Sequence, residues 1–150
     1  MTFRGTFEHS LDAKHRLTVP AKFRRSLEDG AVLAVSPETT PGTPRSISIW
    51  PPAAFDRFAE ASLAGLNPLS ARARELKRLL NNNSHDVDLD SANRVMIPLS
   101  LIRYAGLDKD VVVTGSGECL ELWDREAYTA YNESALARFP DLAASVGDTD

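Results

Sequence analysis

The chain has 150 residues, of which 43% are hydrophobic and 25% charged, and its formal net charge at pH 7 is −4. This composition is typical of a globular protein with one medium-sized core or two small ones. The sequence contains no run of about 18 apolar residues, and charges interrupt its first twenty residues, so neither membrane insertion nor a secretory signal is predicted. We therefore expect a cytoplasmic protein.

The charged residues are unevenly distributed along the chain. Residues 1–25 hold six basic and two acidic side chains, a local net charge of +4, which leaves −8 for residues 26–150. The six basic residues are Arg4, Lys14, Arg16, Lys22, Arg24 and Arg25. A basic end on an acidic protein favours a single face that meets a polyanion, while the remainder repels non-specific association.

The first structural unit is predicted over residues 5–52. Alternating apolar and polar residues predict a strand, a turn and a second strand, and two aliphatic runs predict two more strands. These four strands span residues 6–11, 16–19, 31–35 and 47–50. Pro20 ends the second strand and opens a predicted two-turn helix over residues 21–27, which Gly30 stops. The unit therefore has the order ββαββ.

Two amphipathic helices are predicted to form the linker between the units, residues 53–82. Apolar side chains recur at helical spacing over residues 52–63 and again over residues 69–80, with glycine and proline between them. Three basic residues share one face of the second helix: Arg74, Lys77 and Arg78. This face could contact DNA, although charges opposite an apolar stripe are commonly only its solvated side.

The second unit, residues 83–126, repeats the first. Shifting the sequence by 78 residues aligns residues 12–20 with residues 90–98, so that an acid, an arginine, two alternating aliphatic residues and a proline coincide. Each copy then ends in a tryptophan, Trp50 or Trp123. We interpret this pattern as a duplication. Because so small a unit is marginal alone, we expect the copies to pack face to face as an intramolecular pseudo-dimer, or else in an intimate oligomer.

Residues 127–150 are expected to form a C-terminal helix and an acidic tail. Asp124 is placed to cap the start of the helix, which should run to about Phe139. Pro140 then begins a frayed acidic segment. With its duplicated units, its linker helices and this last helix, the chain is assigned to the α+β class.

Sequence motifs for catalysis and metal binding are scarce. The chain lacks a phosphate-binding P-loop, a His-Glu-x-x-His motif and a Gly-x-Ser-x-Gly motif. Asp86 and Asp88 resemble the start of a calcium loop, but Ser91 and Ile97 stand where that loop needs glycine and an acid. The single cysteine, Cys119, excludes an internal disulfide and a cysteine-clustered zinc site, and burial is expected for it. We predict no catalytic residue, cofactor, metal site or small-molecule substrate.

A pair of Asp-x-x-x-Arg turns, one in each unit, is the sharpest functional signal. An aspartate that opens a tight turn accepts hydrogen bonds from nearby backbone N–H groups, and an arginine four residues later lies within its reach. Such a pair either braces the turn or aligns the arginine for phosphate oxygens or the guanine edge. The basic residues around Arg16 favour DNA contact there. The second turn is less basic, so Arg94 either contacts DNA or only braces its turn.

These motifs resemble those of the MraZ family of bacterial transcriptional regulators, which carry two AbrB-type, MazE-like swapped-hairpin domains. The resemblance covers residues 3 to about 131, and it rests on residues 3–7, residues 11–24, residues 90–98, residues 105–107 and residues 121–123. It implies a DNA-binding autorepressor of the division and cell-wall gene cluster, which assembles as a ring-shaped homo-oligomer on short direct repeats in the nucleoid. The family's arginines map onto Arg16 and Arg94, and its aspartates onto Asp12 and Asp90.

The chain departs from the family pattern at one position of each turn. The family usually has glycine directly before the motif arginine, where this chain has His15 and Asn93. If the turn requires a positive φ, asparagine and histidine are among the more tolerant residues, so both turns should form. His15 would then also touch a DNA phosphate, and the affinity would change mildly with pH.

The predicted DNA-binding site combines both turns with neighbouring basic residues. Its members are Asp12, Lys14, His15, Arg16, Lys22, Asp90, Asn93 and Arg94. Double-stranded DNA and further copies of the chain are the expected partners. The alternative is a protein-interaction or antitoxin-like scaffold module whose basic rim binds an acidic protein.

Overall fold

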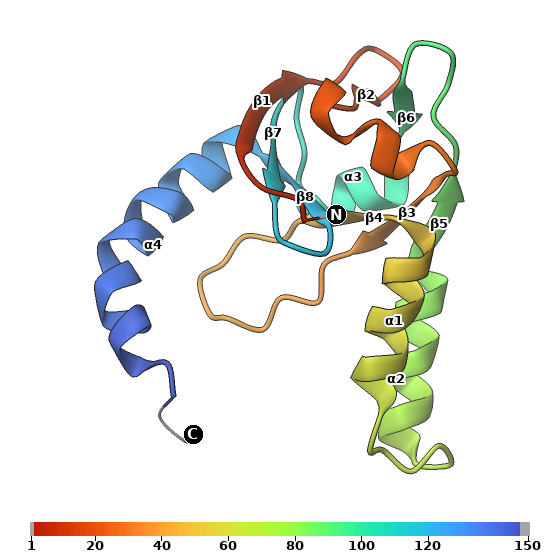
Figure 1. Ribbon diagram of the computed structural model, residues 1–150, viewed down its shortest axis with the longest axis vertical. Coiled ribbons are helices and arrows are strands. Elements are labelled where there is room, and N and C mark those ends of the chain that lie inside the picture. Colours follow the sequence, from red (N-terminus) through yellow and green to blue (C-terminus); the bar gives the residue numbers. More distant parts are fainter. Residues whose placement is uncertain (1, 148–150) are drawn as a thin grey trace.

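The computed structural model describes residues 2–147, which form an α+β fold with two antiparallel sheets (Figure 1). The strands are β1 (Thr6–Ser10), β2 (Arg16–Thr18), β3 (Ala31–Val35), β4 (Ile47–Trp50), β5 (Ser84–Val87), β6 (Arg94–Met96), β7 (Asp110–Gly115) and β8 (Leu120–Asp124). The helices are α1 (Pro52–Leu63), α2 (Ala71–Asn82), α3 (Leu99–Ala105) and α4 (Arg125–Ser145). The predicted fold class is confirmed.

The two copies exchange strands within one sheet. Six strands lie in the order β1-β7-β8-β4-β3-β5, and β2 pairs with β6 in a separate two-stranded ribbon. The hairpin strand β1 pairs with β7 of the second copy, and β5 pairs with β3 of the first, so the arrangement is a swapped-hairpin pseudo-dimer. Face-to-face packing of the copies was a wrong expectation. Strand exchange gives the edge strands of each copy backbone partners that face-to-face packing would not supply.

The main core lies between the large sheet and the β2–β6 ribbon. Leu33, Ile49 and Leu122 bury their side chains on this face of the sheet. From the ribbon, Leu17 and Val95 stand directly opposite each other in the register and are buried in the same core. Full burial of such a side chain stabilises the fold by roughly 1.5–3 kcal/mol relative to exposure. The ribbon is therefore fixed firmly onto the sheet.

Helices α1 and α4 cover the other face of the large sheet, one over each copy. Phe58 of α1 packs on Trp50 with ring centroids 4.8 Å apart. In the same way Tyr131 of α4 stacks on Trp123 at 5.8 Å. In both copies, therefore, an aromatic side chain of the helix packs on the tryptophan of the last strand. Figure 1 shows α1 and α2 running side by side as an arm that extends away from the sheets.

The predicted helix after Pro20 is wrong. Residues 21–27 form two successive 3-10 turns, Ala21–Phe23 and Arg25–Leu27. The side chains of Phe23 and Leu27 are buried in the main core and hold these tighter turns in place. The equivalent segment of the second copy, α3, is a regular α-helix that ends at Gly106.

The bounds of two further helices differ from the prediction. Helix α2 begins at Ala71 because the hydroxyl of Ser70 accepts a hydrogen bond from the N–H of Ala73 at 3.1 Å. Helix α4 continues through Pro140 to Ser145, although a proline inside a helix removes one backbone hydrogen bond. Residues 148–150 of the predicted tail lie outside the described residues.

The start of α4 agrees with the prediction. The Oδ2 atom of Asp124 accepts a hydrogen bond from the N–H of Ala127 at 3.2 Å, so this residue caps the helix as expected. None of the helices within residues 2–147 is long and apolar enough to cross a membrane.

Candidate nucleic-acid interface

The first turn, residues 12–16, is held together by the carboxylate of Asp12. Its Oδ1 atom accepts hydrogen bonds from the backbone N–H groups of Lys14 and Arg16, both at 2.9 Å. Its Oδ2 atom accepts from Nε of Arg16 at 2.6 Å. One carboxylate therefore fixes both the backbone of the turn and the guanidinium that follows it, as the sequence predicts.

The second turn, residues 90–94, repeats this set of hydrogen bonds. Oδ1 of Asp90 accepts from the N–H groups of Ala92 at 2.9 Å and Arg94 at 3.0 Å. Oδ2 accepts from Nε of Arg94 at 3.0 Å. The duplication thus preserves the turn in atomic detail.

One residue in each turn has a left-handed backbone conformation. The angle φ is 57° at His15 and 60° at Asn93. This region disfavours most residues other than glycine, and asparagine and histidine enter it more readily than others. The turn does adopt a positive φ at this position, and it forms with histidine or asparagine there, as expected for that case.

Hydrogen bonds to the backbone lower the pKa values of both turn aspartates. The N–H of Arg16 is the largest cause for Asp12, and the bond and charge of the Arg16 guanidinium act in the same direction against desolvation. The N–H and guanidinium of Arg94 lower the pKa of Asp90 in the same way. Both carboxylates are therefore ionised, and both hold their arginines, throughout the neutral pH range.

The β2–β6 ribbon brings the two turns side by side. Its register places Arg16 opposite Met96 and Thr18 opposite Arg94. In addition, Nη1 of Arg94 lies 3.9 Å from Oδ2 of Asp12 in the other turn. The two motif arginines therefore lie on one small surface although they are 78 residues apart in the sequence.

Each turn is also bonded to the strand of the other copy. The N–H of Val19 donates to the carbonyl oxygen of Asn93 at 2.9 Å. Symmetrically, the N–H of Ile97 donates to the carbonyl oxygen of His15 at 2.8 Å. These bonds tie the left-handed residue of each turn to the opposite strand, so the two turns hold a fixed relative position.

The outer face of the ribbon contains two residues that sequence reasoning missed. Leu17 and Val95 point into the core, so strand alternation places Thr18 and Met96 on the same outer face as the arginines. The apolar side chain of Met96 is 57% exposed. The period of two along each strand could have identified both residues, because each follows a motif arginine by two positions.

The other predicted basic residues lie around the first turn. Lys14 and His15 are exposed within it, and Lys22 is exposed just after β2. Arg24 has a structural contact, because its Nε atom donates to the carbonyl oxygen of Val19 at 3.0 Å. The surface near the first turn therefore carries more free positive charge than that near the second.

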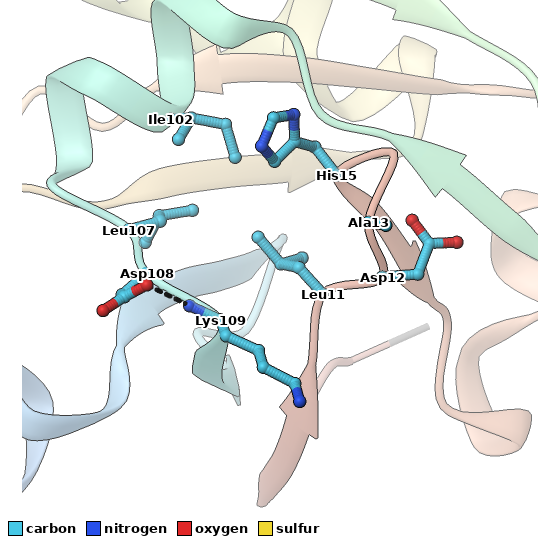
Figure 2. A pocket seen from close by; sticks show the side chains of 8 residues that line it. All are labelled: Leu11, Asp12, Ala13, His15, Ile102, Leu107, Asp108 and Lys109. Atoms are coloured by element: carbon cyan, nitrogen blue, oxygen red, sulfur yellow. Dashed lines mark hydrogen bonds between the residues drawn. The ribbon is translucent and has the colours of Figure 1, made fainter.

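A hollow of about 560 Å³ lies beside the first turn. Figure 2 shows the imidazole of His15 directed towards Ile102, with Leu11 and Leu107 beside it, whereas the carboxylate of Asp12 points away. Apolar side chains from both copies therefore line part of the hollow. Within residues 2–147, no group of three or more His, Cys, Asp or Glu side chains is arranged to hold a metal ion.

The geometry of the turns suits recognition of an external acceptor by arginine. The Nε atoms of Arg16 and Arg94 are engaged by aspartates, which leaves the terminal Nη groups as donors. A guanidinium fixed in this way offers two parallel donors to phosphate oxygens or to O6 and N7 of guanine. A two-stranded ribbon also has the dimensions to enter the major groove of DNA.

Comparison with known proteins gives a consistent result. A family model described as "MraZ protein, putative antitoxin-like" matches residues 2–79 and again residues 80–145, which confirms the duplication. The chain is 36% identical over 146 residues to the transcriptional regulator MraZ of Mycoplasmoides gallisepticum, covering 97% of this chain and 98% of that protein. Its identity to the protein of the same name from Micrococcus luteus is 39%, over 96% of each chain.

A third relative, the transcriptional regulator MraZ of Thiobacillus denitrificans, is 38% identical and is aligned over 89% of its length and 90% of this chain. The family resemblance that the two turn motifs indicated is therefore confirmed. Because the family model matches nearly the whole chain in two copies and these relatives align over most of their lengths, the chain belongs to the MraZ family.

Proposed function

We propose that this chain is a transcription regulator that binds double-stranded DNA through the outer face of the β2–β6 ribbon. The observation that carries the proposal is the pair of arginines, Arg16 and Arg94, each locked by its own aspartate on one rigid ribbon. The relatives that are named transcriptional regulators support it. Preorganised donors lose little freedom on binding, so they favour a defined mode of DNA contact.

Affinity and sequence discrimination come from different residues in and around the first turn. Lys14, His15 and Lys22 are exposed and supply phosphate contacts, which provide most of the affinity. Arg16 supplies discrimination, since a bidentate contact with guanine contributes about 1–3 kcal/mol against a wrong base. Asp12 acts through Arg16 by fixing its orientation.

The second turn has the same framework with less charge. Asp90 fixes Arg94 as Asp12 fixes Arg16, and Asn93 carries an amide of the kind that reads the adenine edge. Arg94 either contacts a base or phosphate in the assembled regulator or braces its own turn. Its 3.9 Å approach to Asp12 supports a bracing part as well.

Several copies of the chain act together in this proposal. A single chain offers few cations to DNA, so tight binding requires several turns on successive direct repeats, where effective concentration multiplies weak contacts. We propose a ring-shaped homo-oligomer that occupies repeats in its own promoter, within the division and cell-wall gene cluster. It represses that promoter and works at the nucleoid in the cytoplasm.

Binding to duplexes with different numbers of repeats tests this proposal. Fluorescence anisotropy would measure the affinity for duplexes that carry one, two or three copies of the repeat found upstream of the chain's own gene. Light scattering in parallel would give the molar mass of the protein. We expect the affinity to rise more steeply than in proportion to repeat number, with a mass of several chains. Equal affinity for all three and for a shuffled duplex would contradict the proposal.

A protein-interaction scaffold is the second candidate. The exposed apolar side chain of Met96, which stands opposite Arg16 in the ribbon, favours a protein partner on the same surface. The salt dependence of duplex binding separates the candidates. A DNA-binding protein with Z phosphate contacts loses affinity with a log–log slope near −0.9Z, whereas a scaffold shows weak duplex binding that does not depend on the DNA sequence.

A further inference from the structure

The two tryptophans differ in one hydrogen bond, although they occupy equivalent places in the two copies. Nε1 of Trp123 donates to Oγ1 of Thr114 at 2.9 Å. Nε1 of Trp50 is buried without a hydrogen-bond partner among residues 2–147, and the side chain is only 4% exposed. An indole N–H that is buried and unpaired is destabilising, so it requires an explanation.

The cause of this difference is one residue in the neighbouring strand. Trp50 is paired with Val32 in β3, and Trp123 is paired with Val112 in β7. Two residues further along, the second copy has Thr114 while the first has Ala34. The first copy therefore lacks the hydroxyl group that would accept the indole hydrogen bond.

Trp50 lines a hollow of about 310 Å³ on the sheet face that carries α1 and α4. We call it the acidic hollow. Its polar lining includes Ser36, Glu38, Glu118 and Glu121. Phe58 adds a second aromatic wall beside Trp50, and no lysine, arginine or histidine of the described chain contributes to the lining. The hollow therefore combines aromatic surface with uncompensated negative charge.

A second buried polar group in the same lining is also unpaired. The hydroxyl of Ser36 has no hydrogen-bond partner among residues 2–147, and this residue is only 5% exposed. Native proteins leave few buried polar atoms unpaired, so each one requires an explanation, such as an ordered water or an ion. The lining of this one hollow contains two residues of this kind.

The carboxylate of Glu121 lies in an environment that lacks positive charge. Burial is the largest cause that raises its pKa; a hydrogen bond from Ser116 lowers it in part, and the charge of Glu38 raises it further. Its Oε2 atom accepts a hydrogen bond from the hydroxyl of Ser46 at a long 3.4 Å. The pKa of the nearby Cys119 thiol is also raised, to about 12, by burial and by the charges of Glu121 and Glu118. A cation placed here would relieve this repulsion.

We propose that the acidic hollow binds a small ammonium compound that also carries an oxygen able to accept a hydrogen bond. The ammonium group pairs with Glu121 and the mouth carboxylates Glu38 and Glu118, and it packs against the ring of Phe58. The oxygen accepts the hydrogen bond of the Trp50 indole, in the role that Thr114 fills for Trp123. A volume of about 310 Å³ is sufficient for a small molecule of this kind.

This site is separate from the proposed DNA surface. Ser48 and Trp50 belong to the sheet face that packs against α1, whereas Ile49 between them belongs to the core beneath the ribbon. The proposal therefore does not depend on DNA binding. Only measurements on the acidic hollow itself can support or contradict it.

Nuclear magnetic resonance of the indole groups tests the proposal on the full-length chain. The sequence contains two tryptophans, so a ¹⁵N-labelled sample gives two indole N–H signals, which a Trp123→Phe variant assigns. Ethanolamine is the probe, with ethylene glycol and ethylamine as analogues that lack the charge or the oxygen. We expect ethanolamine to shift the Trp50 signal saturably and leave the Trp123 signal in place. Each analogue should bind roughly tenfold more weakly, since each loses one strong contact.

Two variants and one matched control make the test specific. Glu121→Gln should weaken ethanolamine binding roughly tenfold, because it removes the charge of the half-buried partner. Ala34→Thr should also weaken it, since the new hydroxyl pairs with the indole of Trp50. The control Thr114→Ala leaves the indole of Trp123 unpaired without an acidic hollow beside it, and ethanolamine should still not shift its signal.

Three results would overturn the proposal. These are a Trp50 signal that does not move with ethanolamine, an equal shift with ethylene glycol, and binding that Glu121→Gln leaves unchanged. If Glu121→Gln does not fold, as its heteronuclear spectrum would show, Glu118→Gln at the exposed mouth replaces it, with a smaller but still measurable loss of affinity expected. Unchanged affinity in that variant would contradict the part assigned to the mouth carboxylates.

Discussion

The first turn, residues 12–16, and the second turn, residues 90–94, share their hydrogen bonds but present different groups to solvent. In both, an aspartate accepts two backbone N–H groups and the Nε atom of the arginine. Between aspartate and arginine, the first turn has Ala13, Lys14 and His15, and the second has serine, alanine and asparagine. The two turns therefore share a hydrogen-bond framework, but only the first carries a basic residue between its aspartate and its left-handed residue.

This difference separates what the fold requires from what the proposed function requires. The turn needs an aspartate, an arginine and one residue that tolerates a positive φ. The remaining positions are exposed, so their charge can change without cost to the core. We therefore expect substitutions at shared positions to affect both stability and binding, and substitutions at exposed positions to affect binding alone.

The largest expected effect comes from the motif arginines. Arg16→Ala should reduce the preference for the chain's own upstream duplex roughly 10- to 100-fold, because it removes a contact of about 1–3 kcal/mol. Arg94→Ala should reduce it less than about fivefold if the second turn mainly braces the ribbon. Anisotropy titrations would measure both, with Arg138→Ala on the exposed side of α4 as the control. Equal losses for the two variants would show that both turns contact DNA alike.

Moving one charge between the turns should change the salt dependence of binding. Lys14→Ala should make the log–log slope of affinity against salt concentration shallower by about 0.9 for each chain that contacts DNA. Ala92→Lys gives the second turn the charge that the first has, and it should steepen the slope only if the second turn also reaches phosphates. Titration of one duplex at four salt concentrations would determine both slopes. Lys14→Ala with an unaltered slope would remove Lys14 from the interface.

The turn aspartates should make stability depend on pH in a defined direction. The pKa of Asp12 is lowered in the folded chain, so its ionised form stabilises the fold above the unfolded aspartate value of about 3.9. This stabilisation is lost as the pH falls through the lower folded value. Asp12→Asn should therefore reduce the melting temperature by a few degrees at neutral pH, and the difference from wild type should close in acid. Calorimetry from neutral pH into acid would check this, and a constant difference would refute it.

The smallest expected effect concerns the left-handed residues. His15→Gly removes a side chain from a positive φ, which favours the fold, but it also adds freedom to the unfolded chain. We expect a net stabilisation of about 0–1 kcal/mol, and less for Asn93→Gly because asparagine tolerates this conformation better. Urea denaturation of both variants would measure the difference. A marked destabilisation of either would mean that its side chain makes a contact that stabilises the fold.

The local structure of the turns could be predicted from sequence because it depends on residues close together in the chain. Asp12 and Arg16 are four residues apart, and their spacing alone indicates the bonds that the turn forms. The strand pairing could not be predicted in this way. A period of two identifies Thr6–Ser10 as a strand, but it does not reveal that its partner is β7, more than a hundred residues later.

Tertiary packing decided the other differences. The segment after Pro20 and the segment after Pro98 align in sequence, yet one forms 3-10 turns and the other an α-helix. The unpaired indole of Trp50 likewise depends on a neighbour from another strand. Single-sequence periodicity carries no information about such neighbours.

The most direct test of the central claim is the binding of the wild-type chain to its own upstream duplex and to a shuffled duplex of the same composition. Anisotropy titrations of both over a range of salt concentrations separate phosphate contacts from base contacts. We predict that both affinities fall as salt rises and that the preference for the upstream duplex persists. Equal affinities for the two duplexes at every salt concentration would contradict the account.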